Sequence, residues 1–264
     1  KELAVEHGYG LTLVKTNTFL HRVPQKRPRT FAVFYQGGVT PFVDGSPDPR
    51  RTPSLAEYLS GVKDNPMRSW SGNLLHEDAW WLACLDVFGG EAALRKAHKD
   101  AKAGTLFNLV CRLGLQEQAK AALRKVGTRD ALAQERLVDR MLSRIGSGQG
   151  VWDGAPYITS PDFFNAVTGR NAPRAIHWEE PRFISLREHM TLMGLPAAYP
   201  EFDKGDENIV AQSVPVNTAK ELVELAILPF LEGKARMSGE AFQRVDWTSA
   251  KREQETGGSV DEVF

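Results

Sequence analysis

Residues 10–35 read GLTLVKTNTFLHRVPQKRPRTFAVFY, and the fold can be approached from this stretch. Two runs in it, Leu11–Val14 and Phe31–Tyr35, are rich in β-branched, aromatic and other apolar residues and predict strands. The polar stretch between them contains Pro24 and Pro28, which resist helix formation. The sequence therefore predicts a strand, a rigid extended loop and a second strand, as in an α/β domain.

The loop carries a small cationic cluster, Gln25-Lys26-Arg27-Pro28-Arg29. Two arginines separated by one residue in extended backbone project side by side and can clamp a phosphate or a ring that bears a carbonyl. Taken alone, the cluster also fits a solvated surface loop. Its functional interpretation therefore depends on a second element of the chain.

Outward from this segment the composition changes. Residues 37–53 are rich in Gly and Pro and indicate a linker. From about 79 to 145 the chain is rich in Ala, Leu, Arg and Lys with apolar positions at helical spacing, which predicts helices closed by a Gly/Ser loop at 146–150. Ser185 and Glu188 form a capping box that predicts a helix to about residue 193, and a final amphipathic helix is expected over 216–231.

Charge is balanced over the chain but not along it. The 264 residues carry 33 Lys and Arg against 33 Asp and Glu, which argues against a uniformly basic nucleic-acid coat. Residues 95–145, however, contain twelve Lys and Arg against five Asp and Glu, a local net charge of +7. The predicted helices therefore form a basic block, which is expected to contact phosphates.

Three ordered motifs resemble a known family. They are Val23-Pro24-Gln25-Lys26-Arg27-Pro28-Arg29, then Pro181-Arg182-Phe183-Ile184-Ser185-Leu186-Arg187-Glu188 with the following Leu195-Pro196, and finally Ala211-Gln212-Ser213-Val214-Pro215. In order and spacing they are similar to the C-terminal motifs of the cytosine-5 DNA methyltransferase family: a Pro-Gln-x-Arg-x-Arg loop, a variable target-recognition region, an Arg-x-Leu-Thr-x-Arg-Glu helix and a Gly-Asn-x-Val-Pro segment. The match covers the two ends of the chain and leaves the middle unmatched, as the variable region of that family would be.

The resemblance implies an α/β fold, namely the C-terminal part of a Rossmann-like methyltransferase domain that uses S-adenosylmethionine, with an inserted, mostly helical target-recognition domain. Residues 1–37 would end the catalytic domain and hold the loop, and 38–175 would be the recognition domain. Residues 176–235 would return to the catalytic domain, and 236–264 would form a polar tail. The implied partners are double-stranded DNA and an N-terminal catalytic segment or subunit.

The resemblance also assigns roles to individual residues. Arg29 would contact the O2 carbonyl of a cytosine flipped out of the duplex, and Arg27 and Gln25 would order the catalytic pocket. The segment Gln212, Ser213 and Val214 would touch the methionine end of S-adenosylmethionine. The basic block would hold the duplex, with Arg124, Lys125 and Arg129 as its proposed DNA-binding residues.

The nucleophile of that family is missing from its expected context. The family uses a cysteine in a Pro-Cys motif and a glutamate in Glu-Asn-Val, whereas Cys84 and Cys111 have other neighbours and are predicted to be buried core residues. Because the first residue is Lys1, we expect the catalytic cysteine in an upstream segment or on a partner subunit. The alternative is a catalytically inactive DNA-binding module derived from such an enzyme.

Other classes of site receive little support. Leu85-Asp86-Val87-Phe88-Gly89-Gly90 echoes the family's Gly-rich cofactor loop, as a circular permutation would require, but is two residues short and predicts a helix-breaking turn. The histidines lack metal-ligand spacing, so no metal is expected. Two cysteines and the lack of an apolar span or signal sequence predict a cytoplasmic protein that contacts no membrane.

Overall fold

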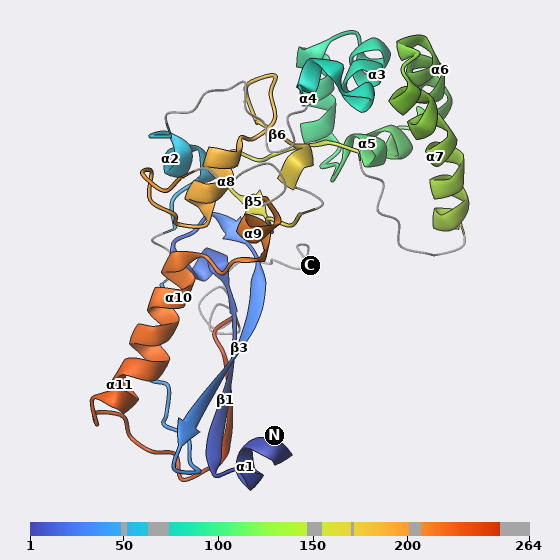
Figure 1. Cartoon of the computed structure of the whole chain (residues 1–264). Coiled ribbons are helices and arrows are strands. Elements are labelled where there is room, and N and C mark those ends of the chain that lie inside the picture. Colours follow the sequence, from blue (N-terminus) through green and yellow to red (C-terminus); the bar gives the residue numbers. More distant parts are fainter. Residues whose placement is uncertain (49–51, 63–73, 147–154, 170–171, 201–206, 249–264) are drawn as a thin grey trace.

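The computed structural model describes residues 1–48, 52–62, 74–146, 155–169, 172–200 and 207–248 (Figure 1). The chain is a mixed α/β protein with small sheets. Its elements are α1 (Glu2–Glu6), β1 (Tyr9–Asn17), the 3-10 turn η1 (Thr18–His21), β2 (Gln25–Lys26), β3 (Pro28–Gln36), α2 (Leu55–Leu59), η3 (Leu75–Glu77), α3 (Ala79–Phe88), α4 (Glu91–Asp100), α5 (Leu106–Arg112), α6 (Gln116–Val126), α7 (Arg129–Gly146), β4 (Tyr157–Ile158), β5 (Phe164–Asn165), η4 (Ala172–Arg174), β6 (Ala175–Ile176), α8 (Leu186–Leu192), α9 (Glu207–Gln212), α10 (Val216–Leu222), the π-helical turn η5 (Val223–Ile227), α11 (Leu228–Leu231) and β7 (Phe242–Asp246).

The two predicted strands are confirmed and pair with each other. β1 and β3 run antiparallel over their full length, from Tyr9 opposite Gln36 to Asn17 opposite Pro28, and β7 adds to the other side of β1 in parallel. Gly10 is required in β1, because a Cβ there would lie 2.4 Å from the carbonyl oxygen of Val39. The largest sheet among the described residues therefore has three strands, and the wider Rossmann-like sheet stays a prediction.

The predicted final helix is confirmed as α10, η5 and α11, and it packs on one face of this sheet. Val14 of β1 forms an apolar cluster with Leu222 and Ala226. Pro229 lacks an N–H and its ring crowds the preceding turn, which favours the wide π-helical turn before it. The hydroxyl of Tyr35 donates to the carbonyl of Ala226 at 2.7 Å, so the sheet is bonded directly to this turn.

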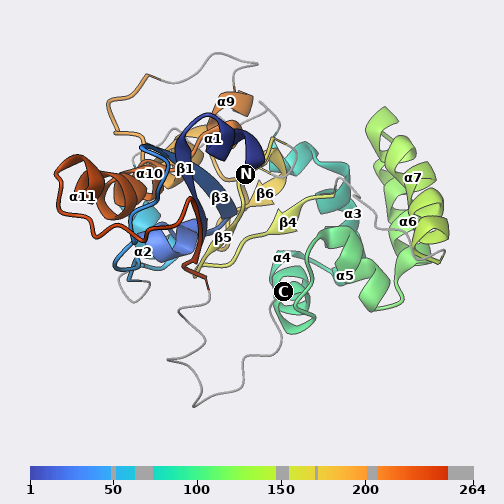
Figure 2. The same ribbon diagram turned by 90° about the horizontal axis from the view of Figure 1, so that it is seen from below.

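The region predicted to be helical folds as α3 to α7, which we call the helical unit. Its core contains Trp80, Leu106 and Leu123, all buried. The turn predicted at Phe88-Gly89-Gly90 is confirmed, because α3 ends at Phe88 and Gly89 has a left-handed φ of 73°. Figures 1 and 2 show the helical unit to one side of the sheet and of α10.

A third apolar cluster lies between the sheet and the helical unit. It joins α2, β5, α8 and α9, with Leu55, Phe164, Met190 and Val210 fully buried. The core of the helical unit also takes in Ile176 and Phe183. Segments on both sides of the boundary expected at 175 thus share cores, and the division into domains stays a prediction.

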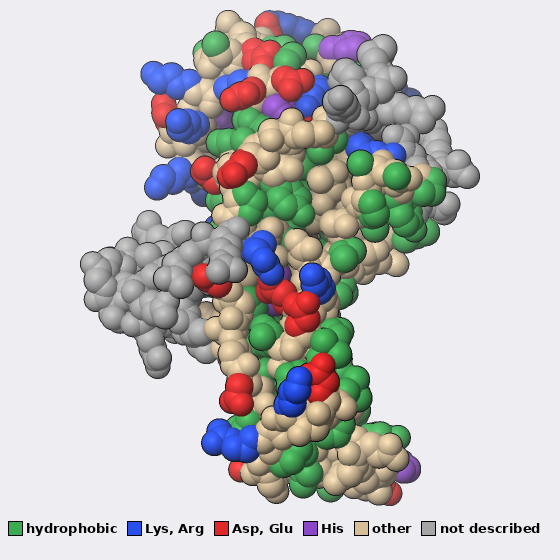
Figure 3. Space-filling view, turned by 90° about the vertical axis from the view of Figure 1, so that its left-hand side faces the viewer, with side chains coloured by type: hydrophobic (Ala, Val, Ile, Leu, Met, Phe, Trp, Pro, Cys, Tyr) green, Lys and Arg blue, Asp and Glu red, His purple; other side chains and the backbone are tan. Residues whose placement is uncertain are grey.

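The surface over α10 and α11 mixes both signs of charge. Lys220 pairs with Glu224 at 3.7 Å, and Lys234 pairs with Glu232 at 2.8 Å. The lower half of Figure 3 shows basic side chains beside acidic ones, with apolar side chains among them. Among the described helices, none is both long and apolar enough to cross a bilayer.

Leu123→Ala should test the core of the helical unit. Removing this fully buried side chain leaves a cavity, so we expect the free energy of unfolding to fall by roughly 2–5 kcal/mol. Leu132→Ala is the matched control, because Leu132 is 37% exposed in α7 and its loss should cost less than about 0.5 kcal/mol. Urea denaturation followed by circular dichroism measures both, and equal effects would contradict the described packing.

Stability should also fall in mild acid. Burial lowers the pKa of His98 in α4 and of His189 in α8 to about 4, below the unfolded value near 6.5. The unfolded chain therefore binds more protons as the pH drops from about 6.5 to about 4, and the free energy of unfolding decreases over that window. In urea titrations across it, His98→Gln should flatten the pH dependence. Replacing the exposed His76 by Gln should leave it unchanged, and an equal effect of both would refute the assignment.

Candidate functional site

The loop between β1 and β3 is folded back on itself by hydrogen bonds between its two ends. The side-chain oxygen of Asn17 accepts from the backbone N–H of Phe19 at 3.1 Å and of Arg27 at 3.0 Å. The N–H of Thr18 donates to the carbonyl of Arg27 at 3.1 Å. The cationic cluster is therefore held in one conformation, unlike a freely solvated loop.

A buried polar network fixes the start of the loop to α10. The neutral His21 ring donates from Nδ1 to Glu221 at 3.0 Å, and its Nε2 accepts from the hydroxyl of Thr16 at 2.7 Å. Burial lowers the pKa of His21 and outweighs the opposing effect of Glu221, which favours this neutral form. Arg22, in the left-handed region at φ 61°, donates to the other oxygen of Glu221 at 3.0 Å.

The middle of the loop pairs with a distant strand. β2 runs parallel to β5, with Gln25 opposite Phe164, and the N–H of Phe164 donates to the carbonyl of Pro24 at 2.7 Å. This pairing places the segment from Phe164 to Val167 against the loop. Lys26, on the outer side of β2, places its ammonium 3.7 Å from the ring centre of Phe163.

Arg27 joins the loop to two other segments. Its guanidinium donates to the carbonyl of Val167, to that of Ala211 at 2.6 Å and to that of Ser213 at 3.2 Å, and the residue is 2% exposed. Burial, with a smaller contribution from the nearby Arg29, lowers the pKa of Arg27 to about 10, so it stays charged at neutral pH. Among the described residues, carbonyl oxygens alone compensate this buried charge, and they hold three chain segments at one point.

Gln25 and Arg29 lie on either side of this buried group. Gln25 is fully buried and donates from Nε2 to the sulfur of Met193 at 3.9 Å, while its Oε1 bonds to none of the residues described. Arg29 is half-buried and uses Nη1 to donate to the carbonyl of Pro28 at 2.8 Å. Nε and Nη2 of Arg29 bond to nothing in the described part of the chain, so they can bind an acceptor from outside.

The segment expected to touch a cofactor meets the loop through its backbone. The carbonyls of Ala211 and Ser213 face Arg27, whereas the side chains of Gln212 and Val214 are exposed. Ser213 uses its own hydroxyl to donate to the carbonyl of Ile209 at 2.6 Å. Gln212 and Val214 can therefore contact a bound molecule, and the Ser213 hydroxyl is already engaged.

The second motif, Pro181–Glu188, forms the start of α8 with the predicted capping box. The N–H of Glu188 donates to the hydroxyl of Ser185 at 3.1 Å, and the N–H of Ser185 donates to the carboxylate of Glu188 at 2.8 Å. Two nitrogens of Arg182 donate hydrogen bonds to the same carboxylate, at 2.8 and 2.9 Å. Burial acts to raise the pKa of Glu188, but the bonds from Arg182 and Ser185 prevail and lower it.

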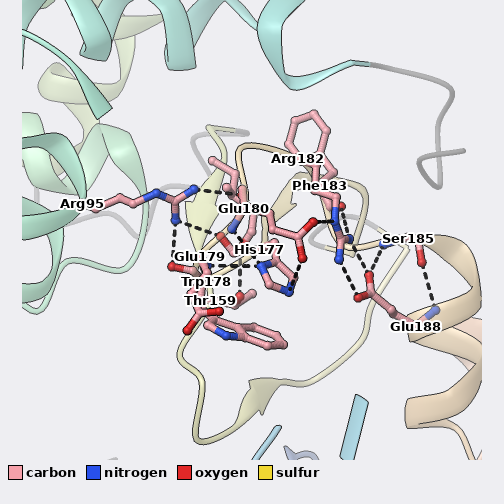
Figure 4. Close-up of polar contacts among 11 residues, drawn as sticks. Arg95, Thr159, His177, Trp178, Glu179, Glu180, Arg182, Phe183, Ser185 and Glu188 are labelled. Atoms are coloured by element: carbon pink, nitrogen blue, oxygen red, sulfur yellow. Dashed lines mark hydrogen bonds and ion pairs between the residues drawn. The ribbon is translucent and has the colours of Figure 1, made fainter. Parts of the chain in front are cut away.

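Arg95 of α4 ties this motif to the helical unit. Figure 4 shows its guanidinium reaching the loop before α8, where it donates to the carbonyls of His177, Trp178 and Glu180, each at 2.9 Å. The His177 ring in turn accepts from the N–H of Glu180 at 3.0 Å. The sequence does not predict this role of Arg95, because no neighbouring residue distinguishes it from the other Lys and Arg residues of the basic block.

The three predicted DNA-binding residues lie on the helical unit, apart from the loop, and differ in their surroundings. Arg124 pairs with Glu135 at 2.6 Å and Lys125 pairs with Asp86 at 2.8 Å. Arg129 is exposed in the first turn of α7. Two of the three cations are thus partly neutralised by carboxylates of the same unit.

Neither cysteine is placed for nucleophilic chemistry. Cys84 is fully buried in the core of the helical unit, and burial raises the pKa of its thiol to about 12. Cys111 is half-buried in α5 of the same unit. The described residues also contain no group of three or more His, Cys, Asp or Glu that could hold a metal ion.

Comparison with known proteins adds no relative. No protein-family model, curated protein or solved structure matches the chain. The resemblance to the methyltransferase motifs therefore stays a hypothesis that depends on the residues and geometry described above.

Arg27→Leu should show whether the buried guanidinium organises the site. The substitution leaves three carbonyls, two of them buried, without their donor, and we expect the free energy of unfolding to fall by about 3 kcal/mol. Arg29→Leu is the matched control and should cost less than about 1 kcal/mol, since its one described bond is to an exposed carbonyl. Urea denaturation of both variants measures the difference. A cost for Arg27→Leu no larger than that for Arg29→Leu would contradict the role given to Arg27.

Proposed function

We propose that the chain is the C-terminal portion of a DNA (cytosine-5-)-methyltransferase. It would bind duplex DNA and help transfer a methyl group from S-adenosylmethionine to C5 of a flipped cytosine. The observation that carries the proposal is the bonding of Arg27 to Ala211 and Ser213, because it unites two of the three motifs at one point although they are about 185 residues apart in the chain. The second motif, which begins α8, reaches the same place because Met193, at the end of that helix, contacts Gln25.

Arg29 is the residue proposed to act on the base. Attack of a thiolate on C6 of cytosine moves negative charge toward O2 and C5, and a fixed guanidinium beside O2 stabilises that charge. Arg29 is suited to this role because it is the second residue of β3, lies two residues after the buried Arg27, and keeps two nitrogens available for an outside acceptor. Gln25 and Arg27 would position it, since both are buried residues of the same loop.

The proposed cofactor segment, Gln212–Val214, is suited to contact one part of the cofactor. S-adenosylmethionine would supply an electrophilic methyl group when bound. Exposed Gln212 can hydrogen-bond and Val214 can contact an aliphatic chain, which suits the methionine end of such a molecule. Because no other described segment is assigned to the adenosine, weak binding of the cofactor by this chain alone is part of the proposal.

The catalytic thiolate would come from another segment. The buried Cys84 and the half-buried Cys111 lie in the helical unit, away from the loop, so neither suits attack on a base beside Arg29. An upstream segment or a partner subunit that carries a Pro-Cys motif would complete the site. The same observation favours the second candidate, a catalytically inactive DNA-binding module that retains the basic helical unit.

Arg29→Gln separates the two candidates when the chain is combined with a segment that carries the Pro-Cys motif. If Arg29 stabilises charge on the base, methyl transfer to duplex DNA should fall about 100- to 1,000-fold while duplex affinity stays the same. Lys234→Gln, an exposed change beside Glu232, is the control and should leave the rate unaltered. The readout is radiolabel transferred from S-adenosylmethionine to C5 of cytosine. Duplex binding without any transfer in the combined, unsubstituted protein would establish the inactive module instead.

A further inference from the structure

We propose that three arginines on the outer face of α7, Arg129, Arg136 and Arg140, bind the phosphate backbone of duplex DNA. We call them the α7 arginine row. The inference rests on the proposed function for its ligand, duplex DNA, and names the surface that would bind it. It moves the proposed phosphate contact from Arg124 and Lys125 to side chains that form no ion pair with any carboxylate in the described residues.

Helix geometry places the three residues on one line. At about 100° per residue, their positions fall within about 40° of one another around α7. The buried residues of the same helix, Val138 and Met141 among them, lie on the opposite side. From the first arginine to the last, the row rises about 16 Å along the axis. All three residues are exposed, and Figure 1 shows α7 at the outer edge of the helical unit.

Two of the three acidic residues of α7 lie beside the row and face α6, and the third, Asp130, is exposed in the first turn. Glu135 pairs with Arg124, and Asp139 pairs with Lys120 at 2.9 Å, both on the side where α7 meets α6. In the described part of the chain, no Asp or Glu lies within ion-pair distance of the row. Its one described polar contact is the bond from Nε of Arg136 to the carbonyl of Leu132 at 3.2 Å. The folded chain thus separates paired cations between α6 and α7 from unpaired cations on the outer face.

The chemistry of the row fits a phosphate backbone. Arginine presents a planar fork of donors that binds phosphate with two hydrogen bonds, and a line of such forks complements a line of phosphates. DNA carries one charge per about 3.4 Å of each strand, so a row of about 16 Å spans several successive phosphates. Arg124 and Lys125, by contrast, would have to release Glu135 and Asp86 before binding phosphate, and those carboxylates would repel the duplex.

The test compares two double variants of the full chain that remove the same charge from neighbouring helices. Binding of a fluorescently labelled duplex is measured by anisotropy over a series of salt concentrations. R136Q/R140Q should weaken binding about tenfold and make the plot of log affinity against log salt less steep by about 2, because two phosphate contacts are lost. R124Q/K125Q should leave that slope unchanged, and R136K/R140K should retain it because the charge is kept. Thermal melting of each variant shows that the fold is retained.

Several outcomes would overturn the inference. The first is an unchanged slope for R136Q/R140Q, the second is an equal loss for R124Q/K125Q, and the third is no duplex binding by the unsubstituted chain at low salt. Tighter, equally row-dependent binding of duplex RNA would overturn the assignment to DNA. The catalytic proposal fails separately: row-dependent duplex binding without methyl transfer in the combined protein would refute the transfer and leave the row established.

Discussion

The buried guanidinium of Arg27 is the interaction on which the site depends. A charge removed from water must be compensated, and three backbone carbonyls from two distant segments do so here. Their positions are thereby tied to the loop between β1 and β3. Arg29 inherits a defined place because it follows Arg27 by two residues in the same extended backbone. The half-exposed Arg29 can therefore contact a ligand, whereas the buried Arg27 fixes the conformation of the loop, although both residues are arginines.

The other cationic side chains also divide into those that hold segments of the fold together and those that are exposed without a described ion-pair partner. Arg95 and Arg182 are buried enough, and bonded to enough oxygens, to hold the segment before α8 against both the helical unit and α8. Arg124 and Lys120 join α6 to α7 through carboxylates. The arginines on the outer face of α7 hold no part of the described structure together, which is the reason they are available for a partner. The basic block is thus partly structural, and its net charge overstates the charge that a ligand would meet.

Local patterns were sufficient wherever neighbouring residues set the conformation. The strands around the loop, the capping box of Ser185 and Glu188, the turn at Gly89 and the final helix were all predicted, because each follows from the preferences and periodicity of neighbouring residues. Patterns of this kind could not show that Glu221 would meet His21, since the pair is 200 residues apart in the chain. They also treated Arg124, Lys125 and Arg129 alike, because a count of charges carries no information on which carboxylate lies opposite each one.

Sequence patterns predicted the two strands around the loop, the helical region, the capped helix and the final helix, and with them the mixed α/β class, but not β7, which pairs with β1. Those properties follow from backbone preferences and side-chain types. The tertiary structure buries Arg27 and leaves Arg29 partly open, exposes Gln212 and Val214, and pairs Glu135 and Asp139 of α7 with α6. Burial and pairing depend on segments far apart in the chain, and a side chain's charge acts on a ligand only where the fold leaves it exposed and without a partner.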